Sequence, residues 1–502
     1  MTLQRTIDAA IARGASQLTL QPPSAEYDCT AASLVIMDGV DLEIDGLGAT
    51  LWFAPGTGLS VKNCTRVRVQ NVALDYTPTL AQGVVTSVDA ARHSFVAKFD
   101  ADFLRVDQLG PPHFPGDGQV KVAFFSNATR RMLRNASLDA AINIFAATSE
   151  TALVDPSANT WRVNVTGNLN AFQYAVAVGL PVLVFPRGGS HSLVVSQSAH
   201  CVFTDVRIYG GGSMGIVDAG GVGGNTYRRV VLDRRPLRRG RDMELLASPL
   251  FRYLASNADG IHSTSNNDAP TLVDSTISWT GDDLANICSA MSVTLVPVGE
   301  EALAFVDIGG NLATAQRGDV MSFYHLTTMV FQGSATIASV EVGSADPTAL
   351  AAMRAGYAAM QAPPYSAHFV SEPEHFFVTG SPVAITFQGS RPAFAQKYWS
   401  LAVLEATDNS NALVQNTTLS DGYARAFMVK GRDSTFVNNT FRRAGGIWIG
   451  PEQAWLEGDP GIRNVTIENN VFDAIGDTPV EYNCNTTGRG FVVRNNTVTR
   501  SY

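Results

Sequence analysis

Apolar and polar residues alternate along this chain in a motif that returns many times. Each copy reads apolar–x–apolar, then one or two polar residues, then an apolar residue and a turn that often contains glycine. The period of two within each copy predicts short strands with one face turned inward. The clearest copies are NCTRVRVQNVAL (63–74), CVFTDVRIYGG (201–211), TLVDSTISWTG (271–281), NALVQNTTLSDG (411–422), STFVNNTFRRAGG (434–446), NVTIENNVFDAIG (464–476) and GFVVRNNTVTRSY (490–502).

The spacing of these copies predicts a right-handed parallel β-helix. Asn416 and Asn439 lie 23 residues apart, and Asn470 and Asn496 lie 26 apart. Each coil of such a solenoid advances by one strand spacing, about 4.8 Å. Asparagines that recur at one turn are expected to form a ladder, in which each amide bonds the backbone of the next coil. A leucine-rich repeat would need an LxxLxL pattern, and a propeller would need four strands per roughly 40–50 residues.

The repeat is interrupted twice, which divides the chain into five segments. Both interruptions lack the asparagine pattern but contain strand signals such as SFVAKF and DVMSFYHL, so we expect inserted antiparallel β-barrel or sandwich modules. The segments are 1–81 (cap helix and first coils), 82–190 (first module), 191–289 (coils), 290–405 (second module) and 406–502 (last coils). A short amphipathic helix is predicted over Thr6–Ala15, where it covers the N-terminal end, and another over Ala349–Gln361. The fold class is therefore all-β.

Composition and charge narrow the classes of function. The 502 residues are 45% hydrophobic and 16% charged, with a formal net charge of −9, which argues against nucleic acid as the general partner. The apolar run 174–185 is too short for a membrane span and contains Pro181. Nine N-x-S/T sequons predict a secreted glycoprotein, although no signal peptide opens the chain, so we expect a trimmed N-terminus. The open C-terminal coil is expected to be covered by further residues of the protein or by a partner, as in a homo-oligomer.

Five scattered cysteines contain no CxxC pair, which indicates neither a zinc site nor a small disulfide framework. We expect most of them to be buried in the core, and we expect no cofactor and no metal. A basic stretch between Arg228 and Arg241 contains seven arginines. It is interpreted either as a solvated loop or as the edge of a cleft that attracts an anionic glycan.

Candidate chemistry centres on the stretches Asn257–Gly260 and Gly281–Asp283. Asp259 lies 23 and 24 residues before Asp282 and Asp283, a spacing that matches the period of one coil. An aspartate next to glycine is usually a turn residue, but stacked coils would bring these three together. Repulsion and burial in such a cluster raise the pKa of one carboxyl and leave the others ionised. A protonated acid beside an ionised base is what cleavage of a glycosidic bond requires, and their separation decides between inversion and retention.

Several other residues are candidate contacts to a sugar. Each also has a structural interpretation: histidine or glutamate solvated on a loop, arginine and lysine in surface ion pairs, and tryptophan packed in the core. The candidates for substrate binding are His262, Trp279, Arg425, Lys430, Trp448, Glu452, Trp455 and Glu481.

The motif NADGIHS (257–263) followed by TGDDLANI (280–287) resembles the α-1,3-galactosidases of glycoside hydrolase family 110, which share a β-helix with the polygalacturonase-like family 28. The resemblance extends over 250–260 and 423–472. It implies exo-acting cleavage of terminal α-linked galactose with inversion. By analogy with family 28, it implies Asp282 as the general acid, with Asp259 and Asp283 positioning and activating water.

This chain departs from the family at one place near the motif. Family members continue with an Asn-Val-His-Gly-like segment, where this chain has Asn286-Ile287-Cys288-Ser289. The missing histidine bears on the galactose contacts rather than on the acidic trio. The elements with which family 28 binds galacturonate are not recognisable, which disfavours a polygalacturonase.

Two alternatives to a hydrolase remain open from the sequence. A polysaccharide lyase would bind calcium through the acidic trio and take a base from the arginine-rich loop. A non-catalytic carbohydrate-binding β-helix would use none of the carboxylates for chemistry. In each case the partner is a glycan.

Overall fold

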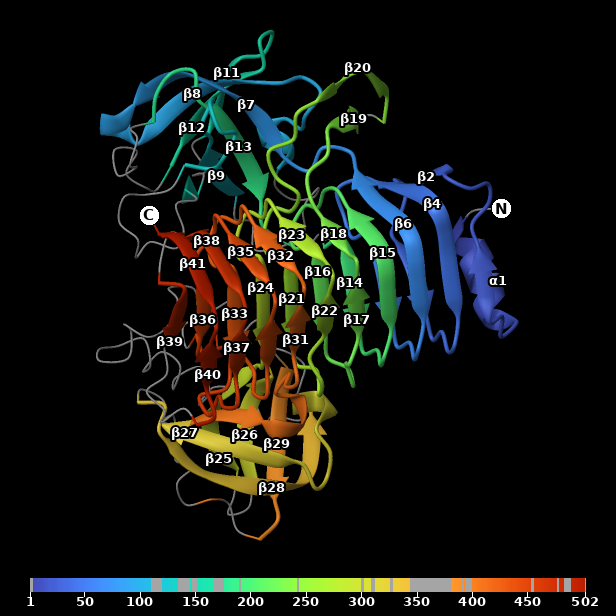
Figure 1. Ribbon diagram of the computed structural model, residues 1–502, viewed down its shortest axis with the longest axis vertical. Coiled ribbons are helices and arrows are strands. Elements are labelled where there is room, and N and C mark those ends of the chain that lie inside the picture. Colours follow the sequence, from blue (N-terminus) through green and yellow to red (C-terminus); the bar gives the residue numbers. More distant parts are fainter. Residues whose placement is uncertain are drawn as a thin grey trace.

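The computed structural model in Figure 1 is built around one solenoid of parallel strands. It describes residues 3–109, 120–133, 145–146, 151–165, 176–188, 191–241, 243–298, 302–307, 312–325, 328–343, 381–389, 392, 400–452, 456–475, 478–482 and 489–501. The statements below concern these residues.

Two long parallel sheets form the solenoid and confirm the predicted parallel β-helix. The nine-stranded sheet contains β3 (Leu34–Met37), β5 (Leu59–Lys62), β14 (Leu193–Ser196), β16 (Ile216–Ala219), β21 (Ile261–Thr264), β24 (Ala285–Cys288), β33 (Phe427–Lys430), β36 (Ile447–Ile449) and β39 (Val480–Tyr482). The seventeen-stranded sheet contains β1 (Gln17–Thr19), β2 (Glu26–Asp28), β4 (Glu43–Phe53), β6 (Arg68–Tyr76), β15 (Val202–Ile208), β17 (Thr226–Arg228), β18 (Val231–Leu232), β22 (Thr271–Val273), β23 (Thr276–Ser278), β31 (Leu413–Gln415), β32 (Thr418–Ser420), β34 (Thr435–Val437), β35 (Thr440–Arg442), β37 (Thr466–Glu468), β38 (Val471–Ile475), β40 (Val492–Arg494) and β41 (Thr497–Ser501).

The alternation in sequence decides which side chains enter the solenoid. In β21 the first and third residues, Ile261 and Ser263, are buried, whereas His262 and Thr264 between and after them are less buried. Equivalent positions stack from coil to coil, because the strands pair in parallel and in register. Each fully buried aliphatic or aromatic side chain in these columns contributes about 1.5–3 kcal/mol to folding.

The predicted asparagine ladder is present in the last coils. Asn439 Oδ1 accepts a hydrogen bond of 2.9 Å from the backbone N–H of Thr417, and Asn470 Oδ1 accepts one of 2.8 Å from the N–H of Asn439. Asn496 continues the series by accepting from the N–H of Asn470 at 2.9 Å. Asn439, Asn470 and Asn496 also donate to backbone carbonyls, so the ladder satisfies buried polar groups at the turn.

The helix α1 (Leu3–Ala12) covers the N-terminal coil, three residues earlier than predicted. Ile7 and Ala10 pack against the core. The side chain of Gln4 donates to the carbonyl of Val35 (2.7 Å) and accepts from its N–H (2.8 Å). An otherwise unpaired strand edge is thereby given hydrogen-bond partners.

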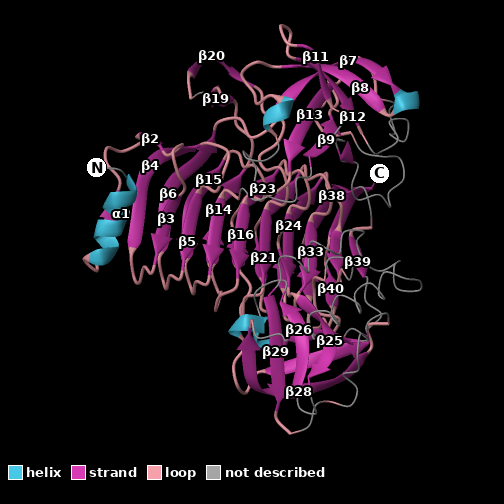
Figure 2. Ribbon diagram, turned by 180° about the vertical axis from the view of Figure 1, so that it is seen from behind, coloured by secondary structure: helices cyan, strands magenta, loops and turns pink. Residues whose placement is uncertain are grey.

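Two antiparallel modules interrupt the solenoid and lie along opposite edges of it (Figures 1 and 2). The first is a seven-stranded sheet of β7 (Ala81–Asp89), β8 (Ser94–Phe99), β9 (Val120–Phe124), β10 (Phe145–Ala146), β11 (Ala152–Asp155), β12 (Thr160–Asn164) and β13 (Pro181–Pro186). The second is a closed barrel of β25 (Met291–Val298), β26 (Ala302–Asp307), β27 (Val320–His325), β28 (Phe331–Val342), β29 (Ser381–Phe387) and β30 (Ser400–Leu404). The helix predicted over 349–361 lies outside the described residues.

A buried polar cluster fastens the barrel to the coils. Arg432, on the coil after β33, contacts Asp459 and lies 3.1 Å from a carboxylate oxygen of Asp408. Tyr324 of β27 donates a 2.9 Å hydrogen bond to Asp459. The barrel and the coil therefore share one carboxylate, and burial helps to raise the pKa of Asp408 to about 6.

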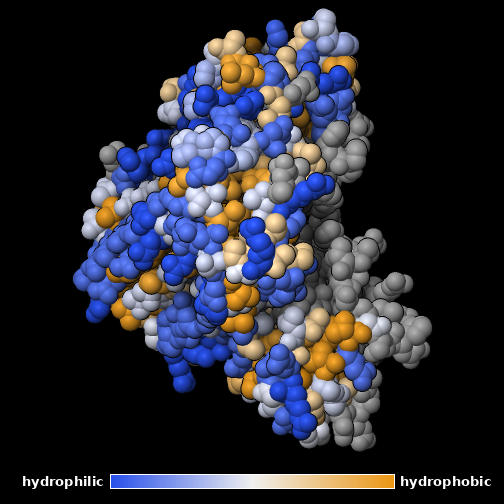
Figure 3. Space-filling view, turned by 90° about the vertical axis from the view of Figure 1, so that its right-hand side faces the viewer, coloured by the Kyte–Doolittle hydropathy of each residue, from blue (hydrophilic) through white to orange (hydrophobic). Residues whose placement is uncertain are grey.

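The surface mixes hydrophilic and hydrophobic side chains, as Figure 3 shows for one face. Among the described helices, none has the length and apolar character that a membrane span requires. The four described cysteines, Cys29, Cys64, Cys201 and Cys288, are buried and free, as expected for most of the cysteines. Cys484 lies outside the described residues.

Candidate active site

The three predicted aspartates lie in two stacked loops that lead into neighbouring strands. Asp259 precedes β21, and Asp282 and Asp283 precede β24, whose residue Ala285 pairs with Ile261. The backbone N–H of Gly260 donates to the carbonyl of Asp283 at 2.9 Å. Parallel pairing of the strands therefore sets the register of the loops that carry the carboxylates.

Glycine is required in both loops because the coils approach closely. A Cβ atom at Gly260 would lie 2.5 Å from the carbonyl oxygen of Leu284, and one at Gly281 would lie 2.4 Å from that of Asn257. No side chain fits at such distances without moving the backbone. Glycine beside the aspartates in Asp259-Gly260 and Gly281-Asp282-Asp283 thus has a steric reason, because the coils leave no room for a side chain.

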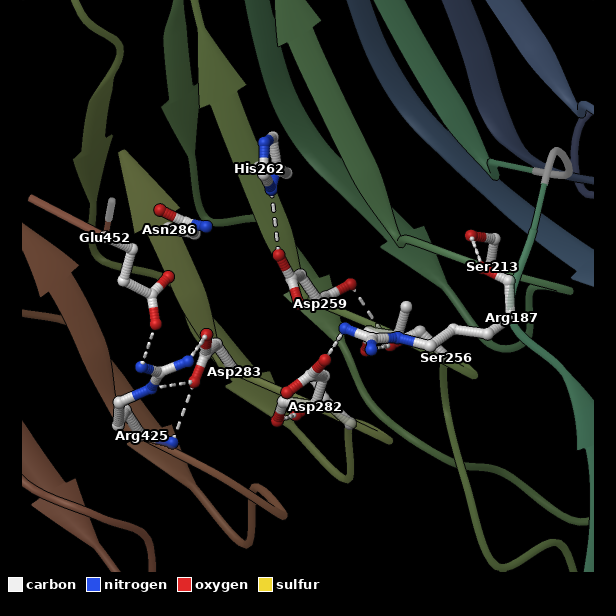
Figure 4. Close-up of polar contacts among 12 residues, drawn as sticks. Arg187, Ser213, Ser256, Asp259, His262, Asp282, Asp283, Asn286, Arg425 and Glu452 are labelled. Carbon is white, nitrogen blue, oxygen red and sulfur yellow. Dashed lines mark hydrogen bonds and ion pairs between the residues drawn. The ribbon is translucent and has the colours of Figure 1, made fainter. Parts of the chain in front are cut away.

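The carboxylates of the trio converge (Figure 4). One oxygen from each of Asp259, Asp282 and Asp283 lies within 4.8 Å of the others, and the three residues are only 3%, 4% and 3% exposed. Buried like charges at this distance repel strongly. The arrangement persists in a folded protein only when cations or protons offset the repulsion.

Each carboxylate of the trio has its own basic partner. His262 Nδ1 lies 2.8 Å from Asp259 Oδ2. Arg187, which follows β13 of the first module, contacts Asp282. Asp283 accepts three hydrogen bonds from Arg425, from the backbone N–H (2.9 Å), Nε (2.9 Å) and Nη2 (3.1 Å).

A second layer of charge surrounds Arg425. Its Nη1 donates to Glu452 at 2.6 Å, and Glu452 in turn accepts from Lys430 at 2.8 Å. Lys430, which is fully buried, also contacts Glu457. Burial opposes the charge of Lys430, but Glu457 and Glu452 raise its pKa above the ordinary value. The cations in turn lower the pKa of both glutamates against the effect of burial.

The titration of the inner groups follows from burial and from their neighbours. Burial raises the pKa of Asp283, and the charge of Asp259 raises it further, while Arg425 opposes the shift. Burial disfavours the charged form of His262, but Cys288 and the hydrogen bond to Asp259 raise its pKa well above the ordinary value. Burial and the charge of His262 lower the pKa of nearby His191 to about 4, so His191 is neutral at pH 7.

The structure brings some predicted contact residues together and separates others. His262, Arg425, Lys430 and Glu452 belong to the network just described, in charge pairs that are largely buried. Trp448, on β36, borders the network: Arg425 lies 5.8 Å from its ring centroid, and its Nε1 is buried with no hydrogen-bond partner among the described residues.

Two other predicted contact residues in the described part of the chain lie apart from these charge pairs. The ring of Trp279 packs against the core, and the guanidinium of Arg234 lies 3.2 Å from its centroid. Trp279 therefore lies beneath the arginine-rich loop, and its contact with a sugar stays a prediction. Glu481 is exposed on β39, the strand beyond Trp448. Trp455 lies outside the described residues.

Five residues at the site were not predicted from the sequence: Arg187, His191, Asn286, Cys288 and Glu457. Arg187 and His191 lie on the segment that connects the first module to the next coil, and they belong to no recognisable sequence motif. Asn286 and Cys288 belong to the segment that departs from family 110, a signal that pointed to the site. Glu457 follows Glu452 in a turn, and antiparallel bridges to Ala290 and Glu452 position its backbone.

Three of the seven arginines in the arginine-rich stretch are paired closely with carboxylates. Arg229 pairs with Asp205 at 2.7 Å, and Arg235 pairs with the fully buried Asp75. Arg239 pairs with Glu26 at 2.6 Å. The pairs of Arg235 and Arg239 hold the loop onto the early coils, and a carboxylate offsets the charge of each of the three arginines.

A cavity of about 570 Å³ lies elsewhere, between the coil turns and the barrel. Ser265, which follows β21, lines this cavity, whereas Asp259 precedes the same strand. The cavity is therefore at the opposite end of the strands from the trio.

Comparison with known proteins supports the fold. Residues 385–502 match the family described as "Right handed beta helix region". No curated protein matches the sequence.

Matches among solved structures include the A-module of a mannuronan C-5 epimerase from Azotobacter vinelandii and a protein named as a glycoside hydrolase. The first is 7% identical, covers 100% of this chain and 94% of its own, and has a TM-score of 0.25. The second is 7% identical, covers 89% of each chain, and has a TM-score of 0.28. At these values neither structure bears on the activity of this chain.

Proposed function

We propose that this protein is a glycoside hydrolase that removes terminal α-1,3-linked galactose from a glycan. The observation that carries the proposal is the buried trio of Asp259, Asp282 and Asp283, with oxygens within 4.8 Å of one another. These residues occupy the motifs that resemble family 110. Three carboxyl groups in one buried site, each with a different basic partner, suit general acid–base cleavage.

The contacts favour distinct roles for the three carboxyl groups. Asp283 accepts three hydrogen bonds from Arg425, which suits a carboxylate that remains charged and activates water. Its raised pKa makes it a stronger base. Asp259 is oriented by His262. Asp282 has one cationic contact, Arg187 from another module, and we assign it the proton donor's role once substrate displaces that contact.

The proposed stereochemical outcome is inversion. Two carboxyl groups of an inverting enzyme usually stand roughly 6.5–9.5 Å apart, and those of a retaining enzyme about 5–5.5 Å apart. The trio is more compact than the inverting range. With three carboxyl groups, however, Asp259 and Asp283 can hold water between them while Asp282 protonates the leaving oxygen, so inversion does not require a wide gap.

A calcium-dependent lyase is less well supported. The trio already faces Arg187, His262 and Arg425, so a calcium ion would have to displace protein cations. Three arginines of the arginine-rich stretch, the proposed source of a base, are paired with Asp75, Asp205 and Glu26. This pairing favours a neutral galactoside over an anionic galactan.

The test is a screen of aryl glycosides, followed by proton NMR of the first sugar released. Turnover of aryl α-galactoside with β-galactose appearing first is expected, and initial release of α-galactose would contradict inversion. Formation of a product that absorbs in the ultraviolet from a uronate polymer would instead identify a lyase.

Matched asparagine variants separate catalysis from binding. Asp282→Asn should lower kcat by about 10²–10⁴-fold while the protein stays folded. Asp274→Asn is the control, because Asp274 is an exposed turn residue on the same coil. Full activity of a folded Asp282→Asn variant would contradict the proposed mechanism.

A further inference from the structure

Three side chains with different ligand atoms converge beside the acidic trio. His262 of β21, Cys288 of β24 and Glu457 each place one ligand atom within 4.8 Å of the others. His262 and Cys288 point outward from stacked strands, and Glu457 approaches from the turn after β36. We infer that His262, Cys288 and Glu457 form a binding site for a thiophilic divalent cation such as Zn²⁺.

The distances fit a single ion. His262 Nε2 lies 3.8 Å from Cys288 Sγ. Zinc binds histidine nitrogen at about 2.0–2.1 Å and cysteine sulfur at about 2.3 Å, which places the two atoms roughly 3.5 Å apart in a tetrahedral site. His262 and Cys288 therefore need to move by only a few tenths of an ångström to share one ion.

The second nitrogen of His262 is already oriented for this role. Its Nδ1 lies 2.8 Å from Asp259, which leaves Nε2 directed at the thiol. Histidine ligands of metals typically hold their other ring nitrogen against a carboxylate, because this contact fixes the tautomer and the ring orientation. Asp259 would provide that support.

The backbone around Glu457 is fixed rather than free to swing. The N–H of Met291 donates to the carbonyl of Leu456 at 2.8 Å, and the N–H of Gly458 donates to that of Ser289 at 2.7 Å. These bonds tie the turn that carries Glu457 to the segment that follows Cys288. The segments that carry Cys288 and Glu457 are thus hydrogen-bonded to each other.

An unsatisfied polar atom points to a missing ligand at the same place. Asn286, 5% exposed, donates from Nδ2 to Glu457 at 3.2 Å, while its Oδ1 is buried and has no hydrogen-bond partner in the described part of the chain. Buried amide oxygens are nearly always paired. A cation or a water bound to it would satisfy this oxygen.

The balance of charges around the three proposed ligands favours a bound cation. Two cations of the network face three carboxylates: Arg425 and Lys430 against Asp283, Glu452 and Glu457. One negative charge is therefore left over, which a bound cation would offset.

The sequence did not predict this site because its ligands follow no recognised spacing. His262 and Cys288 lie 26 residues apart, about one coil, and Glu457 comes from beyond the second module. The inference does not depend on the proposed hydrolysis.

Binding is tested with the full-length protein after dialysis against a chelator. Titration with Co²⁺ should produce a thiolate-to-Co²⁺ charge-transfer absorption that saturates at equimolar metal and disappears when Zn²⁺ is added. Mg²⁺ should not compete, because it prefers oxygen ligands. No such band in the wild-type protein would overturn the inference.

Variants assign the ligands. Cys288→Ser should abolish the band, and Glu457→Gln should weaken Co²⁺ binding at least tenfold. Asp259→Asn should weaken it about 10–100-fold through the orientation of His262. Cys201→Ser is the control, since Cys201 is a core residue of β-helix coils away from the site. Should Cys288→Ser fail to fold, Glu457→Gln decides, and unchanged Co²⁺ affinity in that variant would overturn the inference.

Discussion

Arg187 contacts Asp282, so a residue at the exit of the first module neutralises a carboxylate at the centre of the β-helix site (Figure 4). Arg187 comes directly after β13 and is partly exposed, whereas Asp282 is buried. The first module therefore contributes to the electrostatics of the trio as well as to the size of the protein.

Replacing Arg187 with glutamine should shift the pH profile of hydrolysis. A neighbouring cation favours the charged form of a carboxylate, so its removal keeps Asp282 protonated to higher pH. The alkaline limb of kcat/KM is expected to move up by about 1 pH unit or more. The measurement is kcat/KM for an aryl α-galactoside across the pH range.

Arg131 provides the comparison for that variant. It lies in the first module and reaches a different carboxylate, Asp421, at 3.6 Å. Arg131→Gln should leave the alkaline limb where it is in the wild-type protein. An identical profile for Arg187→Gln and the wild type would mean that Arg187 does not tune the acid.

The β-helix and the trio were predictable from sequence because both depend on a local period. Alternation identified the strands, and a spacing of one coil brought Asp259 beside Asp282 and Asp283. Arg187 and Glu457 could not be found in this way. Each reaches the site from a segment outside the regular coil. A periodic sequence pattern does not predict where the residues that connect an inserted module to the solenoid will lie.

The repeat in the sequence also does not predict which charged side chains form ion pairs. Arg234 and its neighbours formed an obvious basic stretch, but their carboxylate and aromatic partners come from distant coils. Arg234 of that loop lies over the ring of Trp279, a contact that the sequence around Trp279 does not indicate. Pairing of side chains depends on three-dimensional neighbours, which a single sequence does not specify.

Lys430→Met should destabilise the protein strongly. Lys430 is fully buried and serves both Glu452 and Glu457, so its removal leaves buried carboxylates without a cation. The expected cost is about 3–5 kcal/mol in the free energy of unfolding. Denaturant unfolding measures it, with Arg494→Ala as the control, because solvent screens the pair of exposed Arg494 with Glu468 and the pair contributes little to stability.

The asparagine ladder gives a prediction about the C-terminal coils. Asn439→Ala leaves the N–H of Thr417 and the carbonyl of Val414 without their partners. Each buried unsatisfied group costs about 1–3 kcal/mol, so a loss of roughly 2–6 kcal/mol is expected for the two groups. Thermal and denaturant unfolding should both report the loss. A change below about 0.5 kcal/mol would show that water replaces the ladder at this turn.

Asp218 should make the protein less stable as the pH rises from about 4 to 6. Its carboxylate is buried inside the solenoid, where burial raises its pKa to about 6 although Tyr227, Asn225 and Asn266 donate hydrogen bonds to it. Because the folded pKa lies above the ordinary value of 3.8, the stabilising contribution is complete below pH 3.8 and is lost through pH 6.

Asp218→Asn isolates this contribution, because asparagine keeps the shape but does not titrate. The difference in unfolding free energy between the wild type and the variant should change by about 3 kcal/mol across the window, in favour of the variant at higher pH. Asp41→Asn should show the opposite sign, since a hydrogen bond from Arg66 lowers the pKa of exposed Asp41 and its contribution is lost as pH falls. A pH-independent difference for Asp218→Asn would mean that the carboxyl is not shifted.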